Sequence, residues 1–343
     1  MNSLHDTAPR PALDRRLCLA PMMEWTDRHF RYLLRLGAPQ MLLYTEMVTS
    51  AALVHGDAAR LLAFHPDEQP VALQLGGSNP QELAQAARLG EAAGYAEINL
   101  NVGCPSDRVQ SGRFGACLMA EPTLVGDCVA AMREAVRVPV TVKCRIGIDD
   151  QDSESDLRRF IETVAAAGCS VFIVHARKAW LQGLNPKQNR EIPPLDYDRV
   201  YRLKRDYSQL TVVLNGGITR LEAAREHLAR LDGVMIGREA YANPHAMMCW
   251  DAALYGGAEP PSPHALVRAY LPYIEHELAA GTRLASMTRH MLNLFQAVPG
   301  ARAWRRHLSE HAFRLGAGVE VIEAALAKVP ERLDLVMAEP AGS

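Results

Sequence analysis

Cys104 lies where a thiol can act on a substrate. The stretch EINLNVGCP, residues 97–105, begins with the alternating apolar residues of a buried strand and then turns through Asn101, Gly103 and Cys104. The carboxyl ends of strands are where α/β folds place their chemistry. We therefore predict that this thiol faces a ligand and donates a proton. The alternative is a small core residue, because free Cys is among the most buried residue types.

Two glycine-containing turns predict a phosphate site. Asn215, Gly216 and Gly217 end the seventh apolar run of the chain, and Gly237 and Arg238 end the eighth. Glycines let backbone N–H groups approach a phosphate, and an Arg beside them adds charge-assisted hydrogen bonds. Taken alone, a Gly-Gly pair is only a turn. The loops after strands seven and eight of a (β/α)₈ barrel are nevertheless its usual phosphate site, which favours a bound phosphate here.

Three polar residues at other strands indicate which phosphate compound binds. Lys143 lies within the apolar run VTVKCRI, where an unpaired ammonium is costly to bury and a cofactor that becomes anionic would stabilise it. His175 and Gln74 lie near the ends of two further runs and can hydrogen-bond the polar edge of the same ring. The alternatives are a Lys143 paired with a carboxylate such as Glu46, a His175 satisfied in the core and a Gln74 that caps its strand. Together with the phosphate site, these residues converge on flavin mononucleotide (FMN).

The elements that must position these residues are eight short apolar runs, each followed by a helical pattern. Eight such units in about 230 residues predict an α/β fold, a closed (β/α)₈ TIM barrel. A doubly wound sheet is the alternative, but it usually has fewer strands and a G-x-G-x-x-G turn, which this sequence lacks. Alanine-rich stretches such as 80–93 and 157–167 predict the helices. The runs are Leu17–Met22, Met41–Met47, Val71–Gly76, Ala96–Val102, Val140–Ile146, Val171–Ala176, Thr211–Asn215 and Gly233–Gly237.

The strand pattern stops after Asn243 and Pro244, which indicates a second domain. The segment GGAEPPSP is a Gly/Pro linker, and the residues after it have a helical pattern throughout. We predict a tail at 1–16, a catalytic FMN-binding barrel at 17–255, a linker at 256–263, an all-helical domain at 264–335 and a second tail at 336–343.

Bulk composition excludes several classes of protein. The 343 residues include seven Cys without a C-x-x-C pair, the start of the chain has no apolar signal segment, and no run reaches the length of a membrane span. These features predict reduced thiols, a cytoplasmic protein, and no metal site. The net charge of −2 excludes a strongly basic surface overall, although local basic patches remain open.

Two segments carry an excess of positive charge. The stretch 178–190 (KAWLQGLNPKQNR) contains Lys178, Lys187 and Arg190 and no acid. The stretch 283–314 contains six Arg and one acid, Glu310. A cation-rich loop at the barrel rim and a cation-rich helical domain suit contact with a polyanion, and a solvated helix face is the alternative.

The sequence resembles the tRNA-dihydrouridine synthases, in particular the bacterial A-type enzymes of that family. The resemblance covers the barrel from Leu17 to about Pro244, and the helical remainder fits the family more loosely. The matching segments are APMMEWTDRHFR, TEMV, QLGG, EINLNVGCPSDRV, GACLM, VKCRIGIDD, HARKAWLQGLNPKQNR, NGGI and IGREAYANP.

The resemblance implies an FMN-dependent reduction of the C5–C6 double bond of uridines in the tRNA D-loop, at positions 20 and 20a, with NADPH as electron donor. Cys104 matches the proton donor of the family. The implied flavin contacts are Pro21, Met22, Met23, Gln74, Lys143, His175, Asn215, Gly216, Gly217, Gly237 and Arg238. The resemblance and the charge pattern together place RNA contacts at Asn101, Lys187, Arg190, Arg302 and Arg305. The expected partner is tRNA, with the target base turned out of its stack, and no obligate protein partner is evident.

Two other functions fit parts of the pattern. One is a flavin-dependent reductase of a free pyrimidine or an enone, although such an enzyme needs neither the Arg-rich domain nor the basic loop. The other is a flavin- and RNA-binding protein without catalytic activity, which would tolerate the loss of the Cys104 thiol.

Overall fold

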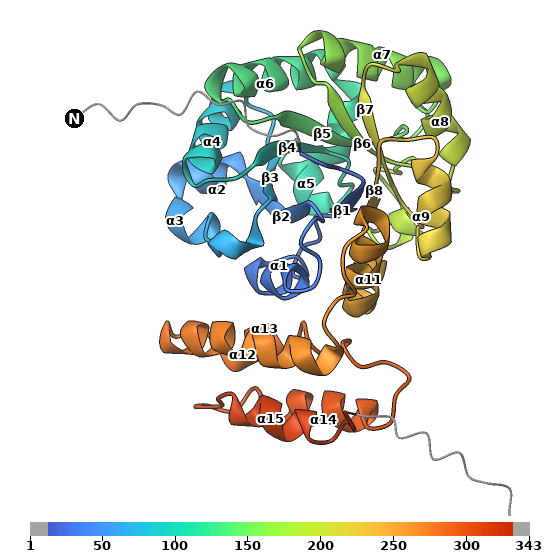
Figure 1. Cartoon of the computed structure of the whole chain (residues 1–343). Coiled ribbons are helices and arrows are strands. Elements are labelled where there is room, and N and C mark those ends of the chain that lie inside the picture. Colours follow the sequence, from blue (N-terminus) through green and yellow to red (C-terminus); the bar gives the residue numbers. More distant parts are fainter. Residues whose placement is uncertain (1–12, 332–343) are drawn as a thin grey trace, which may run out of the picture.

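Eight parallel strands form the centre of the molecule (Figure 1). The structure is a computed structural model that describes residues 13–331, apart from the side chains of residues 107 and 108. The strands follow the order β1-β8-β7-β6-β5-β4-β3-β2, and a parallel bridge between Cys18 and Leu42 joins the two ends into a barrel. This arrangement confirms the predicted TIM barrel. The strands are β1 (Leu17–Leu19), β2 (Leu43–Thr49), β3 (Val71–Gly76), β4 (Glu97–Val102), β5 (Val140–Arg145), β6 (Val171–His175), β7 (Thr211–Asn215) and β8 (Gly233–Ile236).

The first two strands differ most from their predicted bounds. β1 ends at Leu19, three residues early, because Pro21 has no N–H group to continue the ladder after the bond from Ala20 N to Ile236 O. β2 starts two residues later than predicted and runs on to Thr49, with a register shift against β3 between Tyr44 and Met47. A run of apolar residues does not reveal such an irregularity.

Helices surround the barrel and cover its strands (Figure 1). Helix α4 starts after Asn79, whose side chain accepts a hydrogen bond from Glu82 N, and it matches the predicted helix to within one residue. Helix α7 starts three residues before its predicted start, because Ser153 and Asp156 form a capping box ahead of the apolar pattern. The helices of this part are α1 (Arg28–Arg35), α2 (Ser50–His55), α3 (Ala58–Leu61), α4 (Pro80–Ala92), α5 (Asp107–Ser111), α6 (Pro122–Ala135), α7 (Glu154–Ala166), α8 (Tyr197–Asp206), α9 (Leu221–Leu228), α10 (Arg238–Ala242) and α11 (Pro244–Tyr255), with short 3₁₀ helices η1 (Pro66–Glu68), η2 (Gly115–Ala120) and η3 (Gln188–Arg190).

The amino-terminal ends of the strands, which we call the closed end of the barrel, hold a buried charge. Glu97, the first residue of β4, is fully buried and accepts hydrogen bonds from Tyr44 and Thr141, both at 2.6 Å. Arg15 pairs with the same carboxylate, its Nε lying 3.1 Å from Oε2. Residues 13–16 were expected in the N-terminal tail, but Arg15 belongs to the barrel because a buried carboxylate requires a counter-ion.

Up to residue 331, four helices follow the barrel: α12 (Pro263–Ala279), α13 (Leu284–Thr288), α14 (Ala301–His311) and α15 (Glu320–Leu326). Figure 1 shows them below α1, outside the barrel. Helix α12 starts one residue before its predicted start, since Pro263 occupies its first turn and Ser262 caps it. Residues 1–12 of the predicted N-terminal tail, residues 332–335 and the predicted tail at 336–343 lie outside the described residues. Within the described part of the chain, no helix has the length and apolar character needed to cross a membrane.

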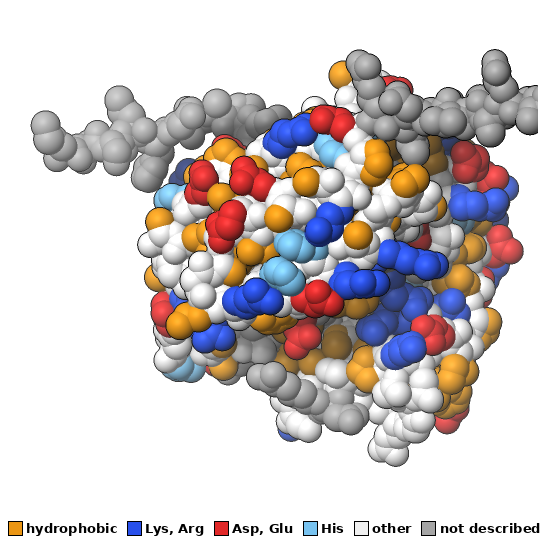
Figure 2. Space-filling view, turned by 90° about the horizontal axis from the view of Figure 1, so that it is seen from below, with side chains coloured by type: hydrophobic (Ala, Val, Ile, Leu, Met, Phe, Trp, Pro, Cys, Tyr) orange, Lys and Arg blue, Asp and Glu red, His pale blue; other side chains and the backbone are white. Residues whose placement is uncertain are grey.

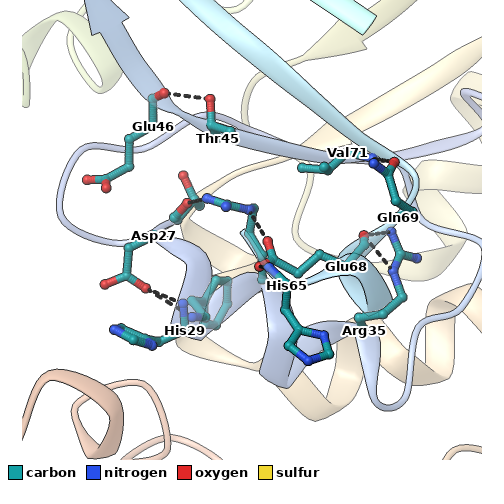
Figure 3. A network of polar contacts seen from close by, with 12 residues as sticks. Asp27, His29, Arg35, Thr45, Glu46, His65, Glu68, Gln69 and Val71 are labelled. Atoms are coloured by element: carbon teal, nitrogen blue, oxygen red, sulfur yellow. Dashed lines mark hydrogen bonds and ion pairs between the residues drawn. The ribbon is translucent and has the colours of Figure 1, made fainter. Parts of the chain in front are cut away.

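Helix α1 joins the barrel to α12 and α13. His29 hydrogen-bonds Tyr273 at 2.7 Å, and Asp27, which caps α1, contacts His290 at 3.0 Å and Arg289 at 2.5 Å. On its other side, α1 contacts the loop before β3 through an ion pair of 2.7 Å between Arg31 and the buried Glu68 (Figure 3). The contacts of His29 and Asp27 with Tyr273, Arg289 and His290 hold the C-terminal helices next to the loop that follows β1.

Candidate active site at the barrel mouth

A cavity of about 530 Å³ opens at the carboxyl ends of the strands, a volume suited to a small ligand. Most of the predicted site residues line it. These are Pro21, Met22, Met23, Gln74, Asn101, Cys104, Lys143, His175, Arg190, Asn215, Gly216, Gly217, Gly237 and Arg238. Lys187, Arg302 and Arg305 lie outside this lining. Among residues 13–331, no group of three His, Cys, Asp or Glu side chains is arranged to hold a metal ion.

The turn after β4 presents Cys104 to this cavity. The side-chain oxygen of Asn101 accepts hydrogen bonds from the backbone N–H groups of Gly103 at 3.1 Å and Cys104 at 3.0 Å. The Cys104 thiol is partly exposed and donates to Ser106 Oγ at 3.5 Å. In contrast, Cys144 is buried, and burial raises the pKa of its thiol to about 12. Cys104 is thus a thiol that a ligand in the cavity can reach.

Lys143 is the cation at the centre of the site. Within residues 13–331, no ion pair or hydrogen bond of the Lys143 ammonium occurs, and Glu46 instead accepts a hydrogen bond from the backbone of Glu24. The predicted alternative of a Lys143–Glu46 pair is therefore not what the structure contains. Burial lowers the pKa of Lys143 to about 8, and the charge of Arg145 adds to this effect. An anion bound beside this ammonium would supply the missing counter-charge.

Arg145 was missed in the sequence reading. It is 3 % exposed and lines the cavity, and its guanidinium donates to the backbone carbonyls of Gly103 at 2.9 Å, Asn189 at 2.9 Å and Lys178 at 3.1 Å. Arg145 thus ties the Cys104 turn to the loop after β6. The alternation of a strand gave the signal, since residues 143 and 145 face the same side.

His175 is kept neutral by its surroundings. Burial lowers its pKa well below the ordinary value, and the charges of Arg145 and Lys143 lower it further. The ring lines the cavity, and within the described part of the chain no hydrogen bond to it occurs. A neutral ring can donate from one nitrogen and accept at the other, so His175 can meet either kind of ligand atom.

The glycines after β7 keep the cavity wall open. Gly216 has φ +117° and Gly217 has φ +72°, a region that side chains disfavour. A Cβ atom at Gly216 would lie 2.6 Å from His175 Cδ2, and one at Gly217 would lie 2.5 Å from Leu195 Cδ1. Larger residues here would displace His175 or the neighbouring loop, so this part of the wall requires glycine.

Charged residues at the outer rim of the cavity form ion pairs that the sequence did not indicate. Arg238 forms an ion pair of 2.8 Å with Glu191, and Lys178 forms one of 2.7 Å with Asp152. Trp25 also lines the cavity, and its ring stacks on that of Tyr241 with centroids 4.6 Å apart. The sequence reading did not single out Trp25, because only the fold brings the loop after β1 next to α10.

The fold and the site together define a (β/α)₈-barrel enzyme whose cavity suits an anionic ligand. The family model "Dihydrouridine synthase (Dus)" matches residues 18–329. The chain belongs to the dihydrouridine synthase family, which confirms the resemblance in the sequence.

Similar proteins in bacteria carry a more specific name. The tRNA-dihydrouridine(20/20a) synthase of Vibrio vulnificus is 60% identical over 322 residues, 93% of this chain and 98% of that protein. Proteins of the same name in Vibrio cholerae and Escherichia coli K12 are 61% and 60% identical and cover 92% of this chain, and the matches span 97% and 92% of those proteins. Among solved structures, a 2-naphthoyl-CoA reductase complex matches with a TM-score of 0.54 at 11% identity, over 71% of this chain and 50% of that one. This last likeness supports the fold alone.

Proposed function

We propose that this chain reduces the C5–C6 double bond of uridines 20 and 20a in the tRNA D-loop, with FMN as cofactor and NADPH as electron donor. The relatives that are about 60% identical carry the name of this activity. The observation that carries the proposal is that one cavity is lined by the Cys104 thiol and by Lys143, whose ammonium has no ion pair among the described residues. A proton donor and an anion-stabilising cation are the two groups that a flavin-dependent reduction requires of the protein.

The cavity fits FMN in the chemistry of its lining. Four cations and one carboxylate, Glu239, line it, so it favours a ligand with negative charge; the cations are Lys143, Arg145, Arg190 and Arg238. Gly216, Gly217 and Gly237 leave backbone N–H groups accessible to a phosphate, and Gln74 and His175 offer donors and acceptors for a polar ring edge.

The residues of the chain divide the chemistry between them. Bound FMN would supply the hydride for carbon 6 of the uracil, with electrons that come from NADPH. Lys143 would stabilise negative charge on the ligand beside it. The Cys104 Sγ–H group would give its proton to carbon 5, and Ser106 is placed to accept a hydrogen bond from that thiol.

The pairing of Arg238 with Glu191 leads to a prediction. Both side chains are about half exposed, 47% and 45%, so the ion pair is weak and competes with a phosphate for the same guanidinium. Glu191→Gln should tighten FMN binding about two- to fivefold, measured by titration of flavin fluorescence at low salt. Glu134→Gln, an exposed acid on α6, is the control and should leave FMN affinity as in wild type. Weaker FMN binding in Glu191→Gln would contradict a phosphate at Arg238.

Contacts between the C-terminal helices and the cavity wall support a role of these helices in tRNA binding. Tyr241 stacks on Trp25 of the cavity wall and hydrogen-bonds His290, the residue that also contacts Asp27. Figure 2 views the molecule from the side of α14 and α15 and shows Lys and Arg side chains grouped towards the lower right of this face. A face with grouped Lys and Arg side chains suits contact with a polyanion. A free pyrimidine would need no such surface, which disfavours the alternative reductase.

The side chains predicted to contact RNA differ in their exposure and in whether they already form a hydrogen bond. Lys187 and Arg302 are exposed, whereas Arg305 donates to the backbone carbonyl of Phe295 at 3.2 Å. If the exposed residues touch phosphates, Lys187→Ala and Arg302→Ala should each lower the slope of log Kd against log salt by about one unit. The measurement is tRNA binding over a salt series. Arg88→Ala, an exposed cation on α4, is the matched control, and an unchanged slope in both test variants would place the RNA elsewhere.

One experiment tests the activity directly. The nucleosides of tRNA from a strain that lacks the gene should contain uridine in place of dihydrouridine at positions 20 and 20a. Supplying the purified protein with FMN, NADPH and this tRNA should restore dihydrouridine at both. Dihydrouridine still present at both positions in the strain would rule out the proposed function.

A further inference from the structure

A chain of buried hydrogen bonds runs through the barrel from its closed end to the Cys104 turn. Asn101 Nδ2 donates to Gln74 Oε1, Gln74 Nε2 to Asn99 Oδ1, and Asn99 Nδ2 to Thr141 Oγ1, each at 2.8 Å. Thr141 Oγ1 then donates to Glu97 Oε1 at 2.6 Å. Asn99, Thr141 and Glu97 are fully buried. We call these five residues the interior relay.

The register of the sheet places these residues side by side. Gln74 of β3 pairs with Asn99 of β4, and Asn99 pairs with Thr141 of β5. Glu97 and Asn101 lie two residues before and after Asn99, on the same inward face of β4. A shift of one residue in either pairing would turn these side chains away from the barrel interior.

Both ends of the relay impose the same orientation on its amides. An ionised Glu97 can only accept hydrogen bonds, so the Thr141 hydroxyl donates to it and accepts a hydrogen bond from the NH₂ group of Asn99. The Asn99 oxygen then accepts from the NH₂ group of Gln74, and the Gln74 oxygen accepts from the NH₂ group of Asn101. At the other end, the Asn101 oxygen is required by the N–H groups of Gly103 and Cys104. The two constraints agree, so each amide has one orientation.

We propose that Glu97, at the closed end of the barrel, is a positioning residue that holds the Cys104 turn through Thr141, Asn99, Gln74 and Asn101. Arg15 supplies the counter-charge for Glu97, Nε to Oε2 at 3.1 Å. The Asn101 oxygen already accepts two hydrogen bonds from the turn, and one of its two N–H groups donates to Gln74. The side chain therefore has one N–H group left that can donate to a ligand. The holding of the turn follows from the contacts alone, and its effect on dihydrouridine formation rests on the proposed function.

Two variants of the same buried cluster provide a matched test. Thr141→Val breaks the relay, whereas Tyr44→Phe removes another hydroxyl that donates to Glu97 Oε1 at the same distance of 2.6 Å but forms no hydrogen bond with the amides of the relay. Thr141→Ser keeps the hydroxyl and is the rescue variant. For Thr141→Ala, which has a smaller side chain than Val at this buried position, we expect the same result as for Thr141→Val.

The readout is the reaction of Cys104 with iodoacetamide in flavin-free protein, followed by peptide mass spectrometry between pH 6 and 9. We expect Thr141→Val and Thr141→Ala to raise the rate for Cys104 about fivefold, the change that one weakened buried hydrogen bond allows. Thr141→Ser and Tyr44→Phe should keep the wild-type rate, and the exposed Cys249 serves as internal reference. A wild-type rate for Cys104 throughout this pH range in Thr141→Val, or an equal rise in Tyr44→Phe, would overturn the proposal.

A second readout connects the relay to the cofactor. FMN added to Thr141→Val should bind more weakly and with a shifted absorption spectrum, because Asn99 loses one of the two hydrogen bonds that hold it against Gln74 and the Gln74 side chain beside the cavity is held less firmly. An unshifted spectrum at full occupancy would count against the relay. Wild-type protein that forms no dihydrouridine would defeat the proposed function and leave the alkylation result standing.

Discussion

Replacing Cys104 by Ala should lower dihydrouridine formation about 10²- to 10⁴-fold, the contribution expected of a general acid. The Cys104 thiol is the proposed proton donor: it lines the cavity, is partly exposed, and is held by the turn after β4. FMN and tRNA affinities should stay close to wild type, because the other cavity and surface contacts remain. The measurement is the initial rate of dihydrouridine formation in tRNA, determined by nucleoside mass spectrometry at saturating FMN and NADPH.

Cys117→Ala is the matched control for this prediction. Cys117 is also partly exposed, lies in the 3₁₀ helix η2 that contacts the Cys104 turn, and does not belong to the cavity lining. Its loss should leave the rate near wild type. Equal, measurable rates in wild type and Cys104→Ala would show that this thiol is not the proton donor, whereas no dihydrouridine from either protein would favour a protein that only binds flavin and RNA. Loss of tRNA binding in Cys104→Ala would instead point to a structural role for the thiol.

The fold could be predicted from the sequence because its strands are buried on both faces. Runs such as 171–176 and 211–215 are almost entirely apolar, and each is followed by a helical pattern. The bounds failed where backbone chemistry rather than hydrophobicity decides, at Pro21 after β1 and at the register shift in β2. The start of α7 was missed for a similar reason, since a capping box contains no apolar residue.

The cavity lining could be predicted because it is local to strand ends. Lys143 and His175 end up in one cavity since parallel strands bring their carboxyl ends together. Arg145 was missed although the alternation of β5 places it on the same side as Lys143, and Trp25 was missed because only the fold brings the loop after β1 next to α10. The pairing of Arg238 with Glu191, 47 residues apart, has no signature in a single sequence.

Replacing Lys143 by Met should separate stability from function. In flavin-free protein the half-buried ammonium has no counter-ion within the described residues, so its removal should raise the melting temperature by up to about 2–4 °C. The same change should lower dihydrouridine formation about 10²-fold, because negative charge on the ligand loses its stabilising cation. Thermal denaturation of the apo-protein and the nucleoside assay measure the two effects. Arg133→Met, an exposed cation on α6, is the control and should change neither.

The pKa of Lys143 also determines how the stability of the flavin-free protein and its FMN affinity depend on pH. Its pKa is about 8 in the folded protein and about 10.4 in an unfolded chain, so the unfolded state binds more protons between these values. The stability of flavin-free wild type therefore gains a contribution as pH rises from about 8 to 10, and the advantage of Lys143→Met should shrink over that range. FMN affinity should fall above pH 8 in wild type, where the ammonium loses its proton, but not in the variant. A stability difference that grows with pH would show that Lys143 is already paired in the folded protein.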